Sequence, residues 1–302
     1  MIAMLGSEMK KLRWRLDLFL MKLYTLRRIR LIMAFAASYL QRGVRAPASD
    51  SESGDQFRYR SLLYTLLMAN YVSLSLIARQ ERYLLPTDFD YVDSKLVVRA
   101  MTERFITQKY ILTDPQRLAD MFVYWGRVEG KRFHDSRDTL ERLAPESSAL
   151  ALDFEGSLEP WTAEMEADYL ECLAKWEALA HQRASKAKSW SGLSLAEMAK
   201  HAGLEDFYKV TYRETSWYTH GLVRVADFFL RNLDDQPVHY SSSTTTMDRI
   251  ECFIQAEWLF VLSFECADSA LGWNAAKRLS EMRDRDAPPL AWLWQWFLSY
   301  FL

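Results

Sequence analysis

Apolar residues recur at spacings of three and four along most of the chain, which is the period of an α-helix. In residues 57–83 they form one broad face, and residues 88–112 repeat the pattern with Val98, Met101 and Phe105 on one side. No segment alternates apolar and polar residues in the manner of a β-strand. The sequence therefore predicts an all-α protein, a multi-helix bundle joined by short connections.

Capping residues and prolines mark where these helices begin and end. Pro115 stands at the first position of one predicted helix, where proline is favoured. Ser194, with Glu197 three residues later, forms a capping box and indicates the start of a short helix. Beyond it we predict two long helices, at about 205–232 and 248–283.

The first 46 residues differ from the rest of the chain in charge. They hold ten Lys or Arg residues and two acidic ones, a balance of +8. The whole chain carries −2, so the remaining residues carry −10. A basic arm on an acidic body is suited to anionic lipid, to nucleic acid such as RNA, or to the chain's own acidic face.

Residues 1–42 are predicted to form a basic amphipathic helix. Its apolar side chains make a narrow seam with two members per seven residues: Ile2, Leu5, Met9, Leu12, Leu16, Phe19, Leu23 and Leu26. Such a seam with basic flanks is typical of a helix that pairs with another helix, in a second copy (a homo-dimer) or in another protein. The alternatives are peripheral contact with a membrane, which usually takes a wider apolar face, and a poorly ordered extension.

These patterns divide the chain into four predicted segments. The basic helix at 1–42 is followed by a linker rich in Ser, Gly and Pro at 43–56, a helical bundle domain at 57–286 and an aromatic C-terminal helix at 287–302. The last segment contains LAWLWQWFLSYFL, which is too short to span a bilayer. It fits packing into the bundle, a subunit interface or membrane contact.

The cysteine count and the missing motifs narrow the class of protein. Three cysteines without a CxxC spacing indicate a reducing compartment and no disulfide framework. The basic arm does not look like a secretory signal, because its charges run through the segment, so we expect a cytoplasmic protein. No HExxH, P-loop or GxGxxG motif occurs, and His134, His181 and His201 lack paired ligand spacing and are expected on the solvated surface. We expect no metal or cofactor and identify no small-molecule partner.

Two groups of polar residues stand out within apolar helices. Arg213, Ser216 and His220 follow one another at spacings of three and four, so they fall on one side of a helix. Arg99 and Glu103, four apart on an earlier helix, are the candidates to pair with them, because buried charges need partners. One interpretation is a structural cluster of paired polar side chains that fixes the register of two buried helices. The other is a site where His220 transfers a proton beside a cation. A Ser216–His220 nucleophile is disfavoured because a regular helix lacks an oxyanion hole.

The order of several short motifs resembles the bacterial helical domain-of-unknown-function family 5677, over roughly residues 60–275. The motifs are Arg99-x3-Glu103, Tyr110-Ile111, Asp114-Pro115, Phe122 before a Lys/Arg-rich helix end, Tyr212-Arg213, Ser216 and His220-Gly221. The resemblance implies an all-helical fold in which Arg99, Glu103, Ser216 and His220 converge. It implies no established activity, because the family itself is uncharacterised.

A looser resemblance is to the HEPN superfamily, whose ribonuclease members carry an Arg-x4–6-His motif. Arg213-x6-His220 matches that spacing, although Glu214 follows the Arg where those nucleases often have an uncharged polar residue. The resemblance implies that Arg213 stabilises phosphate charge and His220 acts as base without a metal. It gives the hypothesis of a stress- or defence-related ribonuclease. The alternative is a non-catalytic interaction or scaffold protein whose polar cluster is structural.

Overall fold

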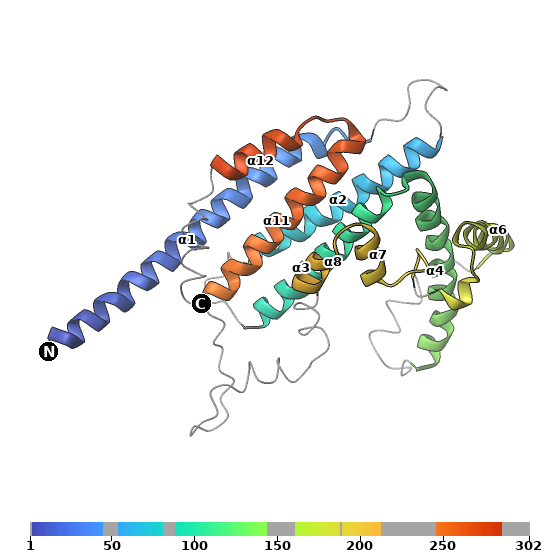
Figure 1. Cartoon of the computed structure of the whole chain (residues 1–302). Coiled ribbons are helices and arrows are strands. Elements are labelled where there is room, and N and C mark those ends of the chain that lie inside the picture. The colour runs from blue at the N-terminus through green and yellow to red at the C-terminus, as the bar shows by residue number, and fades with distance from the viewer. Residues whose placement is uncertain are drawn as a thin grey trace.

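The computed structural model describes residues 2–44, 54–80, 88–143, 161–187, 189–212 and 246–285 (Figure 1). The elements in these ranges are α1 (Ile2–Leu40), α2 (Gly54–Gln80), α3 (Asp88–Ile111), α4 (Pro115–Leu143), α6 (Ala163–Ala180), η1 (Ala184–Lys186), α7 (Leu195–His201), α8 (Glu205–Phe207), η2 (Tyr208–Tyr212), α11 (Thr246–Leu271) and α12 (Ala276–Arg285). All of them are helices, and these ranges contain no strand. The predicted all-α multi-helix bundle is confirmed.

Helix α11 is the centre of the larger of two hydrophobic cores. It contacts α1, α2, α3 and α12, and its Phe260 and Phe264 are fully buried. Ile29 and Ile32 of α1 and Met101 of α3 enter the same core. Helices α2 and α3 thus present to this core the apolar faces that their three-and-four spacing predicts.

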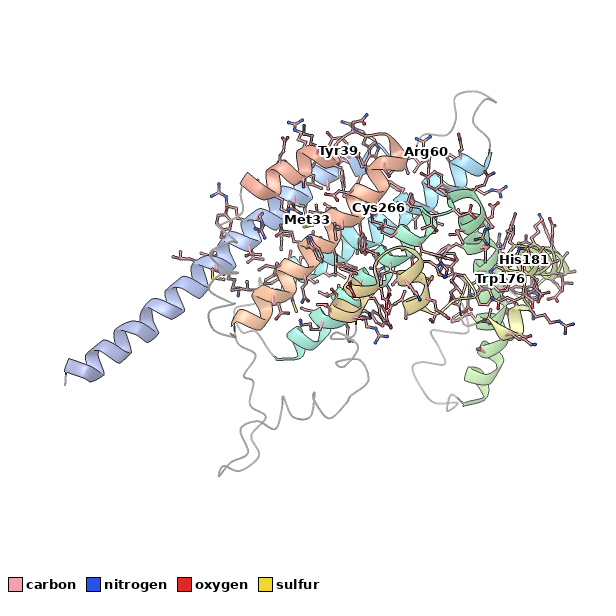
Figure 2. All side chains as sticks on the ribbon, viewed as in Figure 1. Met33, Tyr39, Arg60, Trp176, His181 and Cys266 are labelled. Atoms are coloured by element: carbon pink, nitrogen blue, oxygen red, sulfur yellow. The ribbon has the colours of Figure 1, made fainter. Side chains whose placement is uncertain are left out.

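The smaller core lies between α4, α6 and α7, with parts of α2 and α3 (Figure 1). Trp176 of α6 is fully buried there, with its ring centroid 4.7 Å from that of Trp125. Its indole N–H donates to the carbonyl of Trp190 at 2.6 Å, so the polar end of this large side chain is satisfied. Figure 2 shows Trp176 at a different end of the molecule from Met33, which packs against the larger core.

The second half of α1 packs into the larger core, whereas its first half extends away from the bundle (Figure 1). Leu26, Ile29 and Ile32 are buried, but Leu23, which the predicted seam includes, is 48% exposed. The seam therefore does not continue unchanged into the bundle, because the buried face of α1 has turned away from Leu23. The division of the chain into four domains stays a prediction.

The predicted helix at 248–283 is wrong in one respect, because the chain breaks between α11 and α12. Gly272 and Asn274 adopt positive φ angles of 65° and 55°, which end an α-helix. The Asp268 carboxylate accepts hydrogen bonds from the backbone N–H groups of Ala275, at 3.1 Å, and Ala276, at 3.0 Å, and so caps the start of α12. The apolar spacing continues across the break, which is why periodicity alone did not reveal it.

Helix α2 begins at Gly54, so the last residues of the predicted linker are helical. Its stretch Gln56–Arg79 is long and apolar enough to cross a membrane by length and composition, with a mean hydropathy of 1.5, and 33% of that window is buried in the bundle. No other helix in the described ranges passes this test. The core helix of a soluble protein passes it too, so the finding assigns no membrane span.

Candidate functional site

Part of the predicted polar cluster lies within the described residues, on α3 and η2. The Arg99 Nε donates to Glu103 Oε1 at 3.1 Å, which joins two residues one helical turn apart. The Arg99 Nη2 donates to the Tyr212 hydroxyl at 2.7 Å. Arg99 therefore links α3 to the residue that directly precedes Arg213. Its side chain is 16% exposed and that of Glu103 is 43% exposed, so the cluster lies at the edge of the bundle.

Phe207 anchors the segment that carries Tyr212. Its ring packs against Phe105 of α3, with centroids 5.3 Å apart, and against Trp258 of α11 at 5.5 Å. Because Phe105 is itself in the larger core, these contacts hold the start of the segment on α3. Tyr212 lies five residues further on and reaches Arg99 from that anchor.

The segment is not the regular α-helix that the sequence predicts from residue 205. It starts as the short α8 and continues as the π-helix η2, from Tyr208 to Tyr212. The rings of these two tyrosines are stacked with centroids 4.9 Å apart. This stacking and the Arg99 hydrogen bond both involve Tyr212, the last residue of the π-helix. Such π-helical turns occur often at functional sites.

The charges in the cluster support one another. Burial by itself would lower the pKa of the Arg99 guanidinium, but its hydrogen bonds to Tyr212 and Glu103 outweigh burial, so the pKa is raised. Burial, together with the charge of Glu103, raises the pKa of the Tyr212 hydroxyl. Tyr212 is thus a neutral phenol at neutral pH. The Arg99 Nη1 is buried and has no hydrogen-bond partner among the described residues.

Sequence reasoning missed a second charged contact on the same face of α3. Lys95, one turn before Arg99, has a fully buried side chain whose Nζ lies 3.3 Å from Glu251 Oε1 and from Gln255 Oε1 of α11. The three charged side chains of α3 at positions 95, 99 and 103 follow one another at spacings of four. That spacing is the signal that could have identified Lys95 as a member of the stripe.

A third charged contact, also missed, joins α1 to α11. The Arg28 Nε and Nη2 lie 2.8 Å and 2.7 Å from the Glu257 Oε2, and both side chains are almost fully buried, at 3% and 2% exposed. Burial raises the pKa of the Glu257 carboxyl, and Arg28 only partly opposes it. Arg28 follows Leu26 on the buried side of α1. This position among apolar residues, and not the charge of Arg28, is the feature of the sequence from which its burial could have been predicted.

The remaining predicted site residues, Arg213, Ser216 and His220, lie outside the described residues, as does the predicted C-terminal helix at 287–302. Their convergence with Arg99 and Glu103 therefore stays a prediction. Within the described part of the chain, no group of three or more His, Cys, Asp or Glu side chains could hold a metal ion. The described part of the cluster provides the Arg99 cation, which two hydrogen bonds hold in place, and the neutral Tyr212 phenol, which directly precedes residue 213.

Comparison with known proteins places this cluster inside a family. The family of unknown function DUF5677 matches residues 64–237, which is more than half of the chain and includes α3, α4, α6 and η2. No curated protein and no solved structure matches the chain. The likeness to the HEPN superfamily stays a prediction. The chain belongs to the family of unknown function DUF5677.

Proposed function

We propose that this protein is a non-catalytic interaction protein that binds a helical partner through one exposed face of α1. The observation that carries the proposal is the composition of that face. Leu20, Leu23 and Leu31 are 53%, 48% and 38% exposed, and Arg27 and Arg30 are exposed between them. Their spacing puts all five residues on the side of α1 that faces away from the bundle core.

The charge of this face favours a partner with acidic flanks. Neither Arg27 nor Arg30 makes an ion pair with another residue in the described ranges. Two copies of α1 would bring the same arginines together, and like charges on paired helices repel. The narrow alternation of Leu and Arg also differs from the broad apolar face of a membrane-surface helix. The partner we propose is therefore a helix with an apolar seam flanked by Glu or Asp, in a cytoplasmic protein.

The polar cluster fits a structural role in this proposal. Arg99 is already bonded to Glu103 and Tyr212, and Lys95 is bonded to α11. Such contacts fix how α3 meets its neighbours. The hydrogen bonds to Glu103 and Tyr212 compensate part of the cost of keeping this guanidinium away from water.

The test uses a synthetic helical peptide with Leu at two of every seven positions and Glu beside them. We expect the full-length chain to bind it, and the double variant Arg27→Glu/Arg30→Glu to bind at least about tenfold more weakly, a loss of about 1.4 kcal/mol. The matched control is Arg183→Glu/Lys186→Glu, which makes the same charge change at exposed positions near η1. Fluorescence anisotropy of the labelled peptide gives both affinities.

Other occupants of the face give different results. A stable dimer in light scattering, lost in Leu23→Ser/Leu31→Ser, would replace the proposed partner with a second copy of the chain. Binding to vesicles that contain phosphatidylserine, without binding to the peptide, would replace it with a membrane surface. Equal peptide binding by the Arg27→Glu/Arg30→Glu variant and the parent would contradict the proposal.

A ribonuclease is the second candidate, and one observation favours it. The Arg99 Nη1 has no partner among the described residues and belongs to the residue that holds Tyr212, next to Arg213. A cation beside a general base is the arrangement that metal-independent cleavage of RNA requires. The test is cleavage of mixed RNA in EDTA by the parent, Arg213→Ala and His220→Ala. Activity that both variants lose, with Tm unchanged, would establish this function in place of a purely structural cluster.

A further inference from the structure

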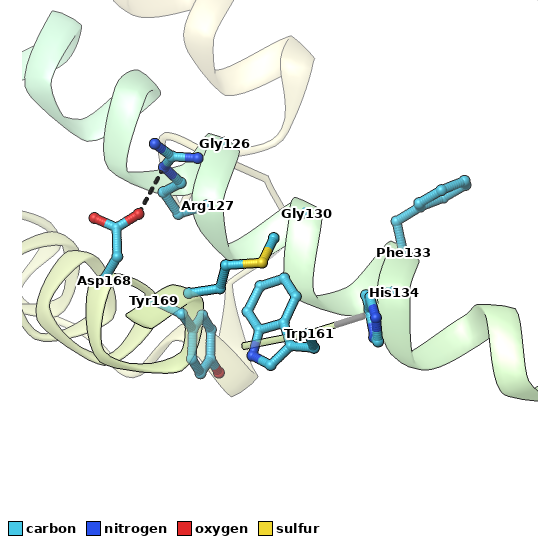
Figure 3. Close-up of a pocket in the computed structure, with 9 residues that line it drawn as sticks. Gly126, Arg127, Gly130, Phe133, His134, Trp161, Asp168 and Tyr169 are labelled. Atoms are coloured by element: carbon cyan, nitrogen blue, oxygen red, sulfur yellow. Dashed lines mark ion pairs between the residues drawn. The ribbon is translucent and has the colours of Figure 1, made fainter. Parts of the chain in front are cut away.

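A hollow of about 270 Å³ lies between α4 and α6 (Figure 3). Its lining shares no residue with the polar cluster or with α1. Trp161, Met165 and Tyr169 line it from the α6 side, and Gly126 and Gly130 line it from α4. An apolar cavity of about 150 Å³ holds a benzene molecule. This hollow therefore has room for a flat group of two fused rings.

The two glycines make the hollow. They are four residues apart on α4, on the same stripe as His134, and each costs the helix about 1 kcal/mol relative to alanine. Glycines at such a spacing often permit close helix packing, but here a Cβ at either position would meet no atom within 4 Å. Their missing side chains leave space instead of bringing the helices together. The two glycines thus lower the stability of α4, and the space that they leave is the hollow.

Arg127 and His134, at the two ends of the hollow, have nitrogen atoms that make no hydrogen bond to a described residue. At one end, the Arg127 Nε lies 2.9 Å from Asp168 Oδ2 (Figure 3), and Asp168 Oδ1 accepts from the Cys172 thiol. No bond within the described part of the chain engages the two terminal nitrogens of Arg127. At the other end, His134 is half-buried with its ring 5.1 Å from that of Trp161, and its ring nitrogens make no hydrogen bond to a described residue. The sequence predicts His134 on the solvated surface, and Trp161 covers part of its ring.

The geometry points to a binding site for a small planar aromatic acid in this hollow. The aromatic body would stack between Trp161 and Tyr169, over the backbone of the two glycines, as flat ligands do in apolar clefts. At the Arg127 end the ligand must supply acceptors, because a guanidinium has only donors. The Asp168 carboxylate already pairs with Arg127 and accepts from Cys172. A carboxylate on the ligand would take the terminal nitrogens of Arg127, which form paired hydrogen bonds with such groups.

Binding of indole-3-propionate, with indole as the neutral comparison, tests the site. Ligand-detected NMR by saturation transfer is the readout, because the signal comes from the ligand and the 11 tryptophans of the protein do not interfere. We expect the full-length parent to bind indole-3-propionate at least about tenfold more tightly than indole, about 1.4 kcal/mol. Arg127→Gln is expected to reduce that preference and to leave indole binding unchanged.

Filling the hollow supplies the decisive variants. Gly130→Leu and Gly126→Leu are expected to abolish binding of both ligands and to raise Tm, because leucine favours the helix over glycine. Gly130→Ala adds a single carbon and is expected to raise Tm while weakening binding only in part. Absence of binding by the parent would overturn the proposal. Undiminished binding by the folded Gly130→Ala and Gly126→Leu proteins would overturn it too, and equal affinity for indole and its acid would overturn the acidic class of ligand.

Discussion

The larger core brings buried polar side chains together over long stretches of sequence, whereas the ion pairs of α4 and α6 lie at the surface. Arg28 and Glu257 are 229 residues apart in sequence, and Asn70 and Ser263 are 193 apart. In α4 and α6, by contrast, the pairs Lys131–Asp135, Glu129–Arg132 and Glu171–Lys175 each lie within one helical turn. The two regions therefore use charge for different purposes.

Buried pairs between helices specify which helix lies beside which, and at what register. Removal of two charges from water costs several kcal/mol, and their attraction returns this only when the partner is in place. A shifted register of α11 would break the contacts that Arg28, Lys95 and Asn70 make with it. The pairs within one turn of α4 or of α6 form in either register and carry little of this information.

The largest expected effect is the loss of one member of the Arg28–Glu257 pair. Glu257→Ala leaves the Arg28 guanidinium buried without its partner, and we expect the free energy of unfolding to fall by about 3–5 kcal/mol. The double variant Arg28→Met/Glu257→Leu removes both charges and is expected to recover most of that loss. Urea unfolding monitored by circular dichroism measures both. A single variant within about 0.5 kcal/mol of the parent would show that the pair does not hold α1 to α11.

The contribution of Glu257 to the stability of the larger core is expected to depend on pH. Because burial raises its pKa, the folded protein binds a proton at a pH where the unfolded chain, with a glutamate pKa of about 4.3, has released it. The contribution of Glu257 to stability is therefore greatest below that unfolded pKa and declines as pH rises through the raised folded value. We expect the difference in unfolding free energy between the parent and Glu257→Gln to decrease over that window. A difference that increases with pH would mean that Arg28 outweighs burial.

Most of the fold could be predicted from the sequence, and most of the buried charge could not. Periodicity located α2, α3 and α4, and the capping box of Ser194 is present as predicted, with its hydroxyl accepting from the Glu197 N–H. Local rules reach only as far as one helix turn. The partner of Arg28 is 229 residues away, and nothing in the spacing of either residue names the other.

In the candidate site, too, the contact within one helix turn could be predicted from the sequence and the contact between distant residues could not. The Arg99–Glu103 contact follows from a spacing of four and is observed, whereas the Arg99–Tyr212 contact depends on the π-helix, which no pattern in the sequence predicts. The Gly126–Gly130 hollow was also missed. Glycines are visible in the sequence, but whether they bring helices together or leave space depends on how α6 crosses α4.

The cap between α11 and α12 is expected to have an intermediate effect. Asp268→Ala leaves the buried N–H of Ala275 and the N–H of Ala276 without their acceptor, and we expect a loss of about 1–2 kcal/mol. Asp268→Asn retains one acceptor oxygen and is the matched control, with about half of that loss or less. Thermal unfolding of the parent, Asp268→Ala and Asp268→Asn gives the order of their stabilities. If Asp268→Ala unfolded at the temperature of the parent, α12 would be held by its apolar contacts alone.

The smallest expected effect belongs to the exposed pair Glu171–Lys175 of α6. Its side chains are 65% and 49% exposed, so water and salt screen their attraction, and both lose side-chain freedom when they pair. We expect Lys175→Ala to leave Tm within about 1 °C of the parent. Glu171→Ala, measured beside it, should behave in the same way. A drop comparable with that of Glu257→Ala would remove the distinction between the two regions, because an exposed, short-range pair would then matter as much as a buried contact across 229 residues.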